Sequence, residues 1–434
     1  MVSKKMNRNT KEINGPVNVV RLEGKIGSIE KVIYLFMDFH AHVTGQTECE
    51  NIFAKDVQLY FAESFDNLNN TKKTYDFFLE TFPKELQNVS KGYPYPIELS
   101  YKEKYLMEIR KFFSKVLKYN PNENKVSLSG YFKNVRLHYI DVRDYFKRSY
   151  IDKLFHIEYV ANDMWRSGFV DLHLLDQIID IIDEVSKDLQ KIISMFGDAV
   201  KSYKKTGQLP VIRFKDLSEK ETQPKISSEE QTKIDEEYIK YLLNKMFSRY
   251  SKPEIQKKLV AQIDLIISNL KTLVSMCENI KTNFIKISDY IRGNPPHILI
   301  KDEKYTGGYN YGINPLEFKD MLTFIVTEIF ILTRKYIEFF MIFMDVYFLR
   351  RFLDKDYITN AIVYTGAAHS NVYIEILTKE FGFKVTHASY SKISDMAKLN
   401  SEILKKDLTD LEELFFPPVF NQCSNMENFP ENFS

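Results

Sequence analysis

The sequence of 434 residues has few cysteines and no excess of either charge. Cys49, Cys277 and Cys423 lie far apart without a CxxC pair, which argues against a disulfide framework or a zinc ribbon and favours a reducing compartment. Sixty Lys and Arg stand against 59 Asp and Glu, so the formal net charge is +1. No overall field attracts nucleic acid, and we expect no nucleic-acid partner.

The sequence also lacks the motifs of several large enzyme classes. It has no Walker-type phosphate loop, no GxSxG elbow and no HExxH helix, which argues against NTPases, α/β-hydrolases and zincins. The N-terminal stretch MVSKKMNRNTKEINGP has no apolar core followed by a small-residue cleavage site. A secretory signal is therefore not expected, and the sequence predicts a cytoplasmic protein.

The most apolar stretch, residues 321–349, is interrupted by charges. The charged residues within it are Glu328, Arg334, Lys335, Glu338 and Asp345. Charges spread through a bilayer span each cost kilocalories, so we expect no transmembrane span and read the stretch as a helix buried within the protein.

What the sequence does contain is enough apolar surface for a packed α/β fold. Hydrophobic residues make up 44% and aromatic residues 14%. Continuous apolar runs at 32–36, 57–61, 361–364 and 383–388 predict buried strands, and 69–82 and a segment from about 371 predict helices. These are β-then-α units.

The middle of the chain follows a different pattern. Apolar residues recur at helical spacing over 171–203, 229–251 and 253–293. The predicted fold is α/β, with a mostly parallel sheet built from the two ends of the chain and a large α-helical insertion. The predicted divisions are a polar segment 1–28, a first α/β part 29–160, a helical region 161–354 with a mobile linker near 205–231, a second α/β part 355–395, and a C-terminal helix and irregular tail 396–434.

Two histidines follow the first predicted strand. In Asp38-Phe39-His40-Ala41-His42 the imidazoles stand at i and i+2, so both can face one side of the sheet. The carboxyl ends of parallel strands are where open α/β sheets build their sites, and neutral imidazole is a common zinc ligand. A pair of partly exposed histidines without a function explains the motif equally well.

A second segment, Gly366-Ala367-Ala368-His369, repeats this arrangement after a later strand. A glycine there lets backbone N–H groups approach a ligand, and the following helix offers its positive end to an anion. His369 is therefore a second candidate for the site, with a role in helix capping or packing as the alternative.

Glu63 and Arg143 complete the candidate site. Glu63 follows the predicted strand 57–61, where a carboxylate can bind metal or act as a general base. Arg143 ends an alternating segment, 135–145, and its guanidinium can clamp an anion, with Asp141 orienting it. A solvated carboxylate and a surface salt bridge are the alternatives for these two residues.

Asp38-x-His40, the acidic Glu63, Arg143 and the late Gly366-x-x-His369 together resemble the superfamily of Tiki proteases, TraB, ChaN and erythromycin esterases, which is marked by two GxxH motifs with acidic residues between them. Met37 stands where the first motif has its glycine. The resemblance implies a hydrolase-like site of His40, Glu63, Arg143 and His369. It also implies a divalent metal such as zinc, manganese or cobalt, held by His40, His42, Glu63 and His369. The substrate is not indicated.

Two phrases, residues 138–143 and 344–349, together with the Asn-, Lys-, Ile- and Tyr-rich composition, resemble uncharacterised proteins of large nucleocytoplasmic DNA viruses. That resemblance implies host cytoplasm or a virion as the location.

Two further readings stay open. The first is a non-catalytic viral structural or interaction protein that keeps the fold and binds protein partners, since a fold does not imply a function. The second is an amidohydrolase, because residues 38–42 resemble the first metal motif of that family. An amidohydrolase barrel needs eight βα units, and the helical middle interrupts that alternation.

Overall fold

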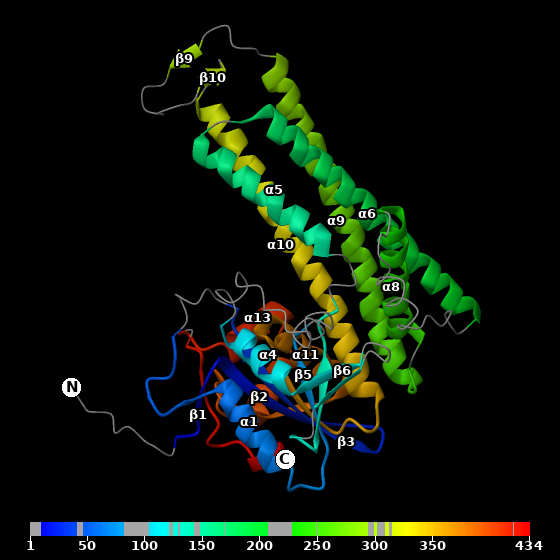
Figure 1. Ribbon diagram of the computed structural model, residues 1–434, viewed down its shortest axis with the longest axis vertical. Helices are drawn as coiled ribbons and strands as arrows, with labels where there is room; N and C mark the ends of the chain where they lie inside the picture. Colours follow the sequence, from blue (N-terminus) through cyan, green and yellow to red (C-terminus); the bar gives the residue numbers. More distant parts are fainter. Residues whose placement is uncertain are drawn as a thin grey trace, which may run out of the picture.

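The computed structural model describes residues 10–40, 47–81, 104–120, 125–128, 131–142, 148–168, 170–206, 228–248, 250–293, 299–301, 309–311, 315–419 and 421–434. The described chain forms an α/β base, from which long helices extend as an arm (Figure 1). One helix, α10 (Pro315–Asp354), runs from the arm down into the base.

The base is organised around a six-stranded sheet with the order β12-β2-β3-β11-β5-β8. Its strands are β2 (Pro16–Ile26), β3 (Ile29–Asp38), β5 (Tyr75–Leu79), β8 (Val135–Tyr139), β11 (Asn360–Gly366) and β12 (Lys384–Ala388). β3, β11, β5 and β8 are mutually parallel, whereas β2 is antiparallel to both of its neighbours. The predicted α/β class is confirmed, and three of the five pairings in this sheet are parallel, so the sheet is mixed and not purely parallel.

Both faces of the sheet are covered, which explains why β5 and β11 are buried along their whole length. On one face lie α1 (Val57–Leu68) and α4 (Lys104–Val116), together with the buried Phe429 and Phe433 near the C-terminus. On the other face lie α11 (Ala367–Phe381), α12 (Met396–Ile403), α13 (Leu408–Phe415) and the C-terminal part of α10. This second core continues into the arm.

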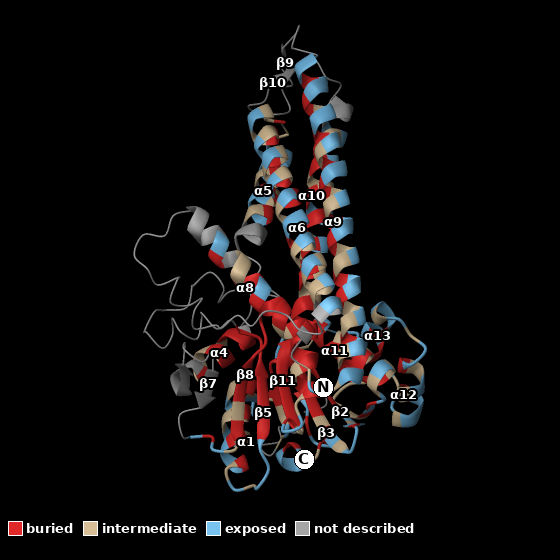
Figure 2. Ribbon diagram, turned by 90° about the vertical axis from the view of Figure 1, so that its right-hand side faces the viewer, coloured by how far each residue is buried: buried red, intermediate tan, exposed pale blue. Residues whose placement is uncertain are grey.

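The arm consists of α5 (Arg148–Ser167), α6 (Leu172–Thr206), α8 (Ser228–Ser248), α9 (Pro253–Gly293) and the N-terminal part of α10. α6 packs along α9, α9 along α10, and α10 along α5. The buried residues of α9 recur every three or four positions, from Ile255 to Ile291. Figure 2 shows the result, in which buried and exposed positions alternate along the arm while the sheet is buried.

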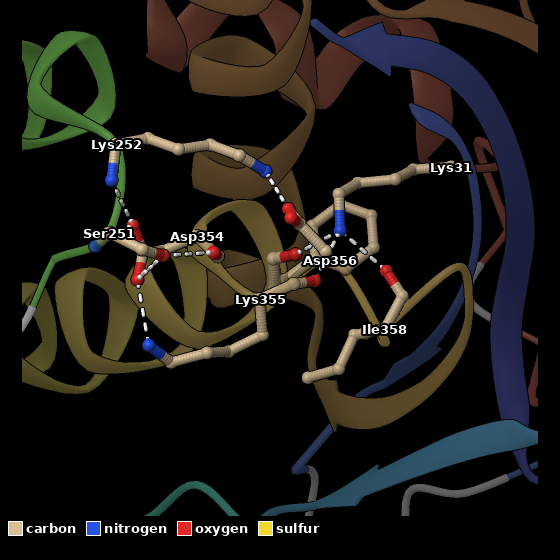
Figure 3. A network of polar contacts seen from close by, with 8 residues as sticks. Lys31, Ser251, Lys252, Asp354, Lys355, Asp356 and Ile358 are labelled. Atoms are coloured by element: carbon tan, nitrogen blue, oxygen red, sulfur yellow. Dashed lines mark hydrogen bonds and ion pairs between the residues drawn. The ribbon is translucent and has the colours of Figure 1, made fainter. Parts of the chain in front are cut away.

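A buried lysine joins the arm to the base (Figure 3). Lys31 of β3 donates from Nζ to the carbonyl oxygens of Phe352, Lys355 and Ile358, at 2.9, 2.8 and 2.5 Å. Those carbonyls lie at and just beyond the C-terminal end of α10, where helix carbonyls lack partners and a cation is favourable. Asp354, in the same network, accepts from the backbone N–H groups of Ser251 and Lys252 just before α9 begins.

Two elements in the first part of the chain were predicted with the wrong secondary structure. Residues 57–61 were expected to form a strand, but they begin α1, whose buried residues Val57, Phe61, Phe65 and Leu68 have helical spacing. Residues 69–82 were expected to form a helix, but they contain β5. The polar segment 1–28 also contributes strands, since β1 (Glu12–Asn14) and β2 lie within it.

The small elements complete the described chain. β1 pairs with β13 (Cys423–Asn425) and β4 (Lys55–Asp56), β6 (Leu117–Asn120) pairs with β7 (Lys125–Leu128), and β9 (Leu299–Lys301) pairs with β10 (Tyr309–Tyr311). A short helical turn, η3 (Glu431–Phe433), ends the chain. The predicted linker, near 205–231, lies mostly outside the described residues; its first two residues end α6 and its last residues begin α8 at Ser228.

The cysteines do not remain separate as the sequence suggested. Cys49 and Cys423 form a disulfide with their Cα atoms 4.9 Å apart, while Cys277 is free and buried. This bond could not be predicted from the sequence, because the two residues are separated by 374 positions and are brought together by the folded chain around the β1–β13 pair. The absence of a CxxC pair was therefore no guide to the pairing.

The apolar stretch 321–349 lies in α10, as expected of a helix. Its C-terminal part, from Phe343 to Leu349, is almost entirely buried, whereas Phe324, Phe330 and Ile331 nearer the arm are exposed. Among the described residues, one helix, α9, has the length and apolar composition to cross a membrane. This is weak evidence for a membrane span, because one face of α9 packs against the other helices of the arm.

Candidate active site at the carboxyl edge of the sheet

Four parallel strands end side by side at one edge of the sheet. β3 ends at Asp38, β5 at Leu79, β8 at Tyr139 and β11 at Gly366. The carboxyl edge of parallel strands is where α/β sheets hold their binding sites, because the chain there leaves the sheet and side chains from different strands converge. His40, Glu80 and His369 each follow one of these strand ends.

His40 follows β3 and is held between two carboxylates. Its Nδ1 lies 2.9 Å from Oδ2 of Asp38, and its Nε2 lies 3.5 Å from Oε2 of Glu80. The imidazole keeps 31% of its surface exposed, while both carboxylates are buried. Tyr364 of β11 donates from its hydroxyl to the other oxygen of Asp38 at 2.6 Å, which fixes that carboxylate from behind.

Glu80, the first residue after β5, is the centre of the polar contacts at this edge. Its Oε2 accepts from the hydroxyl of Thr365 and from the backbone N–H of Gly366, both at 2.9 Å. Its backbone carbonyl accepts from Nε of Arg110 on α4 at 2.7 Å. The carboxylate is therefore fixed by β11 and faces His40 across the strand ends.

His369 lies in the first turn of α11 and forms a pair with a buried carboxylate of α10. Its Nδ1 lies 2.6 Å from Oδ1 of Asp345. Burial raises the pKa of Asp345, and the charge of His369 and its hydrogen bond oppose that rise. Among the described residues, Nε2 of His369 has no hydrogen-bond partner. Asp345 thus orients the ring and leaves the second nitrogen available.

The two histidines meet at Gly366. A Cβ added to this glycine would lie 2.8 Å from Nε2 of His40 and 3.7 Å from Cδ2 of His369, so both rings border the same point. A side chain at position 366 would come too close to the His40 ring, so a substitution there would force that ring to move. The predicted proximity of His40 to His369 agrees with this placement. The N–H of Gly366, expected to face a ligand, is instead bound to Glu80.

The electrostatics favour a charged His40. Burial lowers the pKa of His40, but the hydrogen bonds and negative charges of Asp38 and Glu80 outweigh it, and the net pKa lies well above the ordinary value. The Tyr364 hydroxyl beside Asp38 stays protonated, because burial and the neighbouring carboxylate raise its pKa well above the ordinary value. The site therefore contains an imidazolium between two carboxylates.

The other predicted site residues are not brought into this cluster. Glu63 was placed at a strand end, but it lies on the exposed side of α1, where it pairs with Lys55. Its carboxylate faces solvent because residue 63 falls between the buried positions Phe61 and Phe65 of the helix. His42 and Arg143 lie outside the described residues. Asp141, expected to orient Arg143, is fully buried.

Two functional candidates escaped the sequence prediction, Glu80 and Asp345. A signal for Glu80 was present, since a carboxylate follows the apolar residues 77–79 just as β3 ends in Asp38. Asp345 was noted only as a charge in an apolar stretch. A buried carboxylate costs free energy unless it is paired, so the position of Asp345 in an apolar helix indicates that a partner side chain lies beside it.

The expected metal site is not formed by the side chains as they stand. Within the described ranges, no group of three or more His, Cys, Asp or Glu side chains is arranged to hold a metal ion. His40 turns both of its nitrogens toward carboxylates, so a metal would bind His40 only by displacing a proton from the imidazole.

The fold and the site define a class of mixed α/β proteins with two carboxylate-bound histidines at the carboxyl edge of the sheet and a helical arm. The open sheet excludes the amidohydrolase barrel for the described part of the chain, which has a six-stranded sheet where eight βα units are required. Residues 11–434 match a family described as a family of unknown function, DUF5847, and the chain belongs to that family.

The relatives of this chain are viral proteins. It is 40% identical over 437 residues to "Uncharacterized protein R706" of Acanthamoeba polyphaga mimivirus, covering 100% of this chain and 99% of the relative. It is 37% identical over 440 residues to R161 of the same virus, covering 99% of each chain. The resemblance to proteins of large DNA viruses is thereby confirmed. No solved structure matches the chain at a significant level.

Proposed function

We propose that the carboxyl edge of the sheet is a hydrolase-like active site in which His369 is the general base and His40 stabilises negative charge. The observation that carries the proposal is that two imidazoles, each bound at Nδ1 by a buried carboxylate, border the same glycine. Carboxylate-oriented imidazoles are the usual general acids and bases of hydrolytic sites. The substrate is an ester or amide whose identity the site does not specify.

In the proposed reaction His369 is the general base. Its Nε2 takes a proton from a water molecule, whose oxygen attacks the carbonyl carbon of the substrate, and Asp345 stabilises the imidazolium that forms. His40, positively charged between Asp38 and Glu80, stabilises the negative charge that develops on the carbonyl oxygen. The proton on His369 is then given to the leaving group as the bond to it breaks.

Unpaired polar groups beside His369 support a functional role for this turn. The hydroxyl of Ser370 and both polar atoms of the Asn371 amide are buried and have no hydrogen-bond partner among the described residues. Such groups cost free energy and are concentrated at functional sites. These polar groups in the first turn of α11 could bind a substrate or a water molecule next to His369.

The resemblance to the Tiki, TraB, ChaN and erythromycin esterase superfamily also supports this proposal, with Glu80 in place of Glu63 as the acidic residue. A divalent metal, zinc, manganese or cobalt, is the second form of the proposal. His40, Glu80 and His369 would hold it through Nε2 and Oε2 atoms, since metal-bound histidines commonly have a carboxylate on the other nitrogen. When bound, the metal would activate a water molecule.

The test is hydrolysis of a chromogenic acyl ester, p-nitrophenyl acetate, by the full chain and its variants. We expect His369→Ala to lower kcat/KM by about 10²–10⁴-fold, the usual contribution of a general base. Asp345→Asn should lower it less, with a shifted pH profile, because the ring stays but loses its orienting charge. His173→Ala is the control, because His173 is exposed on α6, where its ring is hydrogen-bonded to Gln177.

Substitution of two carboxylates, one in the site and one outside it, distinguishes the metal-bound form of the proposal from the metal-free form. Glu80→Gln and Glu63→Gln are made in parallel, and melting is followed with zinc, manganese or cobalt. A metal-induced rise in Tm that Glu80→Gln abolishes and Glu63→Gln keeps indicates the metal-bound form, because a ligand that binds only the folded state stabilises it. Turnover that is unchanged by His369→Ala and His40→Ala would contradict both forms.

A second candidate function is a non-catalytic interaction protein of the virus. The observation that favours it is that three aromatic residues of α5 are exposed, Phe155, Tyr159 and Trp165, by 49%, 69% and 48%. Large aromatic residues are enriched in protein interfaces. Abundance of the protein in purified virus particles, with normal infection by a virus carrying His40→Ala and His369→Ala, would support this function over catalysis.

A further inference from the structure

The disulfide between Cys49 and Cys423 joins the C-terminal segment to the chain that carries His40. Cys423 begins β13, which pairs with β1. Cys49 follows His40 by nine residues and lies in a described segment, 47–51, that is neither helix nor strand. The bond therefore ties an irregular segment beyond the end of β3 to a strand of the base.

Gln422, the residue before Cys423, contacts the same chain at two points. Its Nε2 donates to the carbonyl oxygen of Phe39 at 3.3 Å, and its backbone N–H donates to the carbonyl oxygen of Thr47 at 2.8 Å. Phe39 directly precedes His40. The C-terminal segment next to the disulfide thus contacts the chain both before and after this histidine.

Single hydrogen bonds hold the irregular segment elsewhere. The backbone N–H of Cys49 donates to Oδ1 of Asn14 at 2.9 Å, and the hydroxyl of Tyr105 donates to Oε1 of Glu48 at 2.7 Å. Thr47 and Glu48 are exposed, so water competes for such contacts and each contributes little on its own. The disulfide cannot be exchanged for water, which makes it the strongest of these ties.

The contact between His40 and Glu80 depends on where this chain lies. Nε2 of His40 is 3.5 Å from Oε2 of Glu80, at the upper limit of a hydrogen bond, whereas its Nδ1 is 2.9 Å from Oδ2 of Asp38 in the same segment. Glu80 is fixed separately, by Thr365 and Gly366 of β11. A small shift of the chain at residue 40 therefore breaks the contact with Glu80 before the contact with Asp38.

The disulfide is open to exchange and is not needed for folding of the base. Cys49 and Cys423 are both partly exposed, and thiol–disulfide exchange requires such access. Disulfides are essential mainly in small domains that cannot build a core, whereas this sheet has an extensive apolar core on each face. Reduction can therefore release the irregular segment while the sheet stays folded.

We propose that the bond between Cys49 and Cys423 is a redox-sensitive clamp, which keeps His40 against Glu80 when oxidised and releases it when reduced. A dithiol attacks one sulfur, forms a mixed disulfide and closes to its own cyclic disulfide, so that two electrons and two protons pass to the two cysteines. A small disulfide such as oxidised glutathione reverses the exchange. As a control of hydrolysis the clamp rests on the proposed function, but the release of His40 can be measured without turnover.

The test follows the His40 imidazole in the full chain, before and after treatment with dithiothreitol. Nuclear magnetic resonance of the histidine rings measures the pKa of each, and His40→Ala identifies the signal. Although burial lowers the pKa of His40, Asp38 and Glu80 raise it further, so loss of the Glu80 contact should bring it down toward the ordinary value. The signal of the exposed His173 on α6 should not change.

Amide hydrogen exchange followed by mass spectrometry gives a second measure of release. Peptides that cover 47–49 and 421–423 should exchange about tenfold or more faster after reduction, because opening no longer works against a covalent bond. Peptides of β5 should keep their protection. Alkylation of the folded protein should modify two cysteines after reduction and none before it, since the third, Cys277, is buried.

The variants Cys49→Ser and Cys423→Ser should each reproduce the reduced state without a reductant, and dithiothreitol should change them no further. Cys277→Ala is the control, which should respond to dithiothreitol and to oxidised glutathione as the wild type does. The proposal is overturned if reduction leaves the His40 pKa and the exchange rates unchanged, or if the bond is reduced only together with loss of the folded circular dichroism spectrum.

Hydrolysis of p-nitrophenyl acetate distinguishes this proposal from the proposed function. If the site is catalytic, Cys49→Ser should have a lower kcat/KM than the wild type, measured without any thiol that itself attacks the ester. Absence of turnover in both proteins would contradict the proposed function, and the pKa of His40 would still decide whether the clamp exists.

Discussion

The α/β base and the helical arm are stabilised by different kinds of polar contact. In the base, charged groups such as Lys31, Asp76 and Asp345 are buried and each has partners from segments far away in the sequence. In the arm, ion pairs such as Lys191 with Glu236 lie at the surface between neighbouring helices. The base therefore depends on a few contacts that must all form together.

This difference explains why the candidate site lies in the base. A buried carboxylate keeps an imidazole in one orientation and changes its proton affinity, whereas an exposed pair is screened by water. The arm can tolerate substitution at most of its exposed positions, since its helices depend on the repeated apolar face. The following predictions test that contrast, beginning with the largest expected effect.

Lys31→Met should give the largest loss of stability. The substitution removes the ammonium that serves three carbonyl oxygens at the end of α10. The carbonyls of Phe352 and Ile358 lose this donor, while that of Lys355 keeps the N–H of Ile358. Removing one partner of a buried charged contact typically costs about 3–5 kcal/mol. Urea unfolding monitored by circular dichroism measures this loss. A change below about 1 kcal/mol would show that the arm and the base do not depend on this contact.

His138 should give the base a dependence on acidic pH. Burial lowers the pKa of His138 to about 4 from 6.5, and the nearby Arg351 and Arg136 add to the lowering, while the hydrogen bond to Asp76 opposes it. Below pH 6.5 the unfolded chain takes up the proton more readily than the folded chain, so stability falls as the pH drops from 6.5 toward 4. The expected loss at pH 5 is roughly 2 kcal/mol.

The measurement compares urea midpoints at pH 7 and pH 5 for the wild type and His138→Gln. The variant is less stable at pH 7 but should lose less stability between the two pH values, because it has no imidazole to protonate. His173→Gln, in the exposed arm, should follow the wild type. Equal pH dependence of stability in all three proteins would mean that burial does not keep the imidazole of His138 neutral in the folded protein.

The sequence predicted long helices and strand ends better than it predicted short elements. The apolar repeat of α9 extends over the whole helix, so its limits at residues 253–293 were found correctly. The run at 57–61 is too short to separate a strand from a helix, and only the later Phe65 and Leu68 reveal the helical period. The five-residue β5 was lost for the same reason.

The candidate site was predicted in part, for a physical reason. His40 and His369 follow strands that are recognisable from their apolar runs, and the rule that parallel strands end at one edge brings them together. Glu80 was missed because β5 was missed, and Glu63 was chosen because its helix was taken for a strand. Asp345 reaches His369 from a different helix, and no local pattern indicates which segments pack together over such a distance in sequence.

The smallest expected effect is that of Lys191→Gln in the arm, which matches Lys31→Met as a lysine substitution. Lys191 of α6 donates to Glu236 of α8 at 3.0 Å, and its side chain is 58% exposed. Exposed pairs of this kind contribute about 0–1 kcal/mol, because water and salt screen the attraction and two long side chains lose freedom. Urea unfolding at low and high salt should therefore show a small difference from the wild type that disappears in high salt. The loss from Lys31→Met should persist in high salt, because the carbonyls of Phe352 and Ile358 lack the Lys31 donor at any ionic strength. If the two lysine variants lost similar stability, the polar contacts of the base and of the arm would not differ in strength, and burial would not be what separates them.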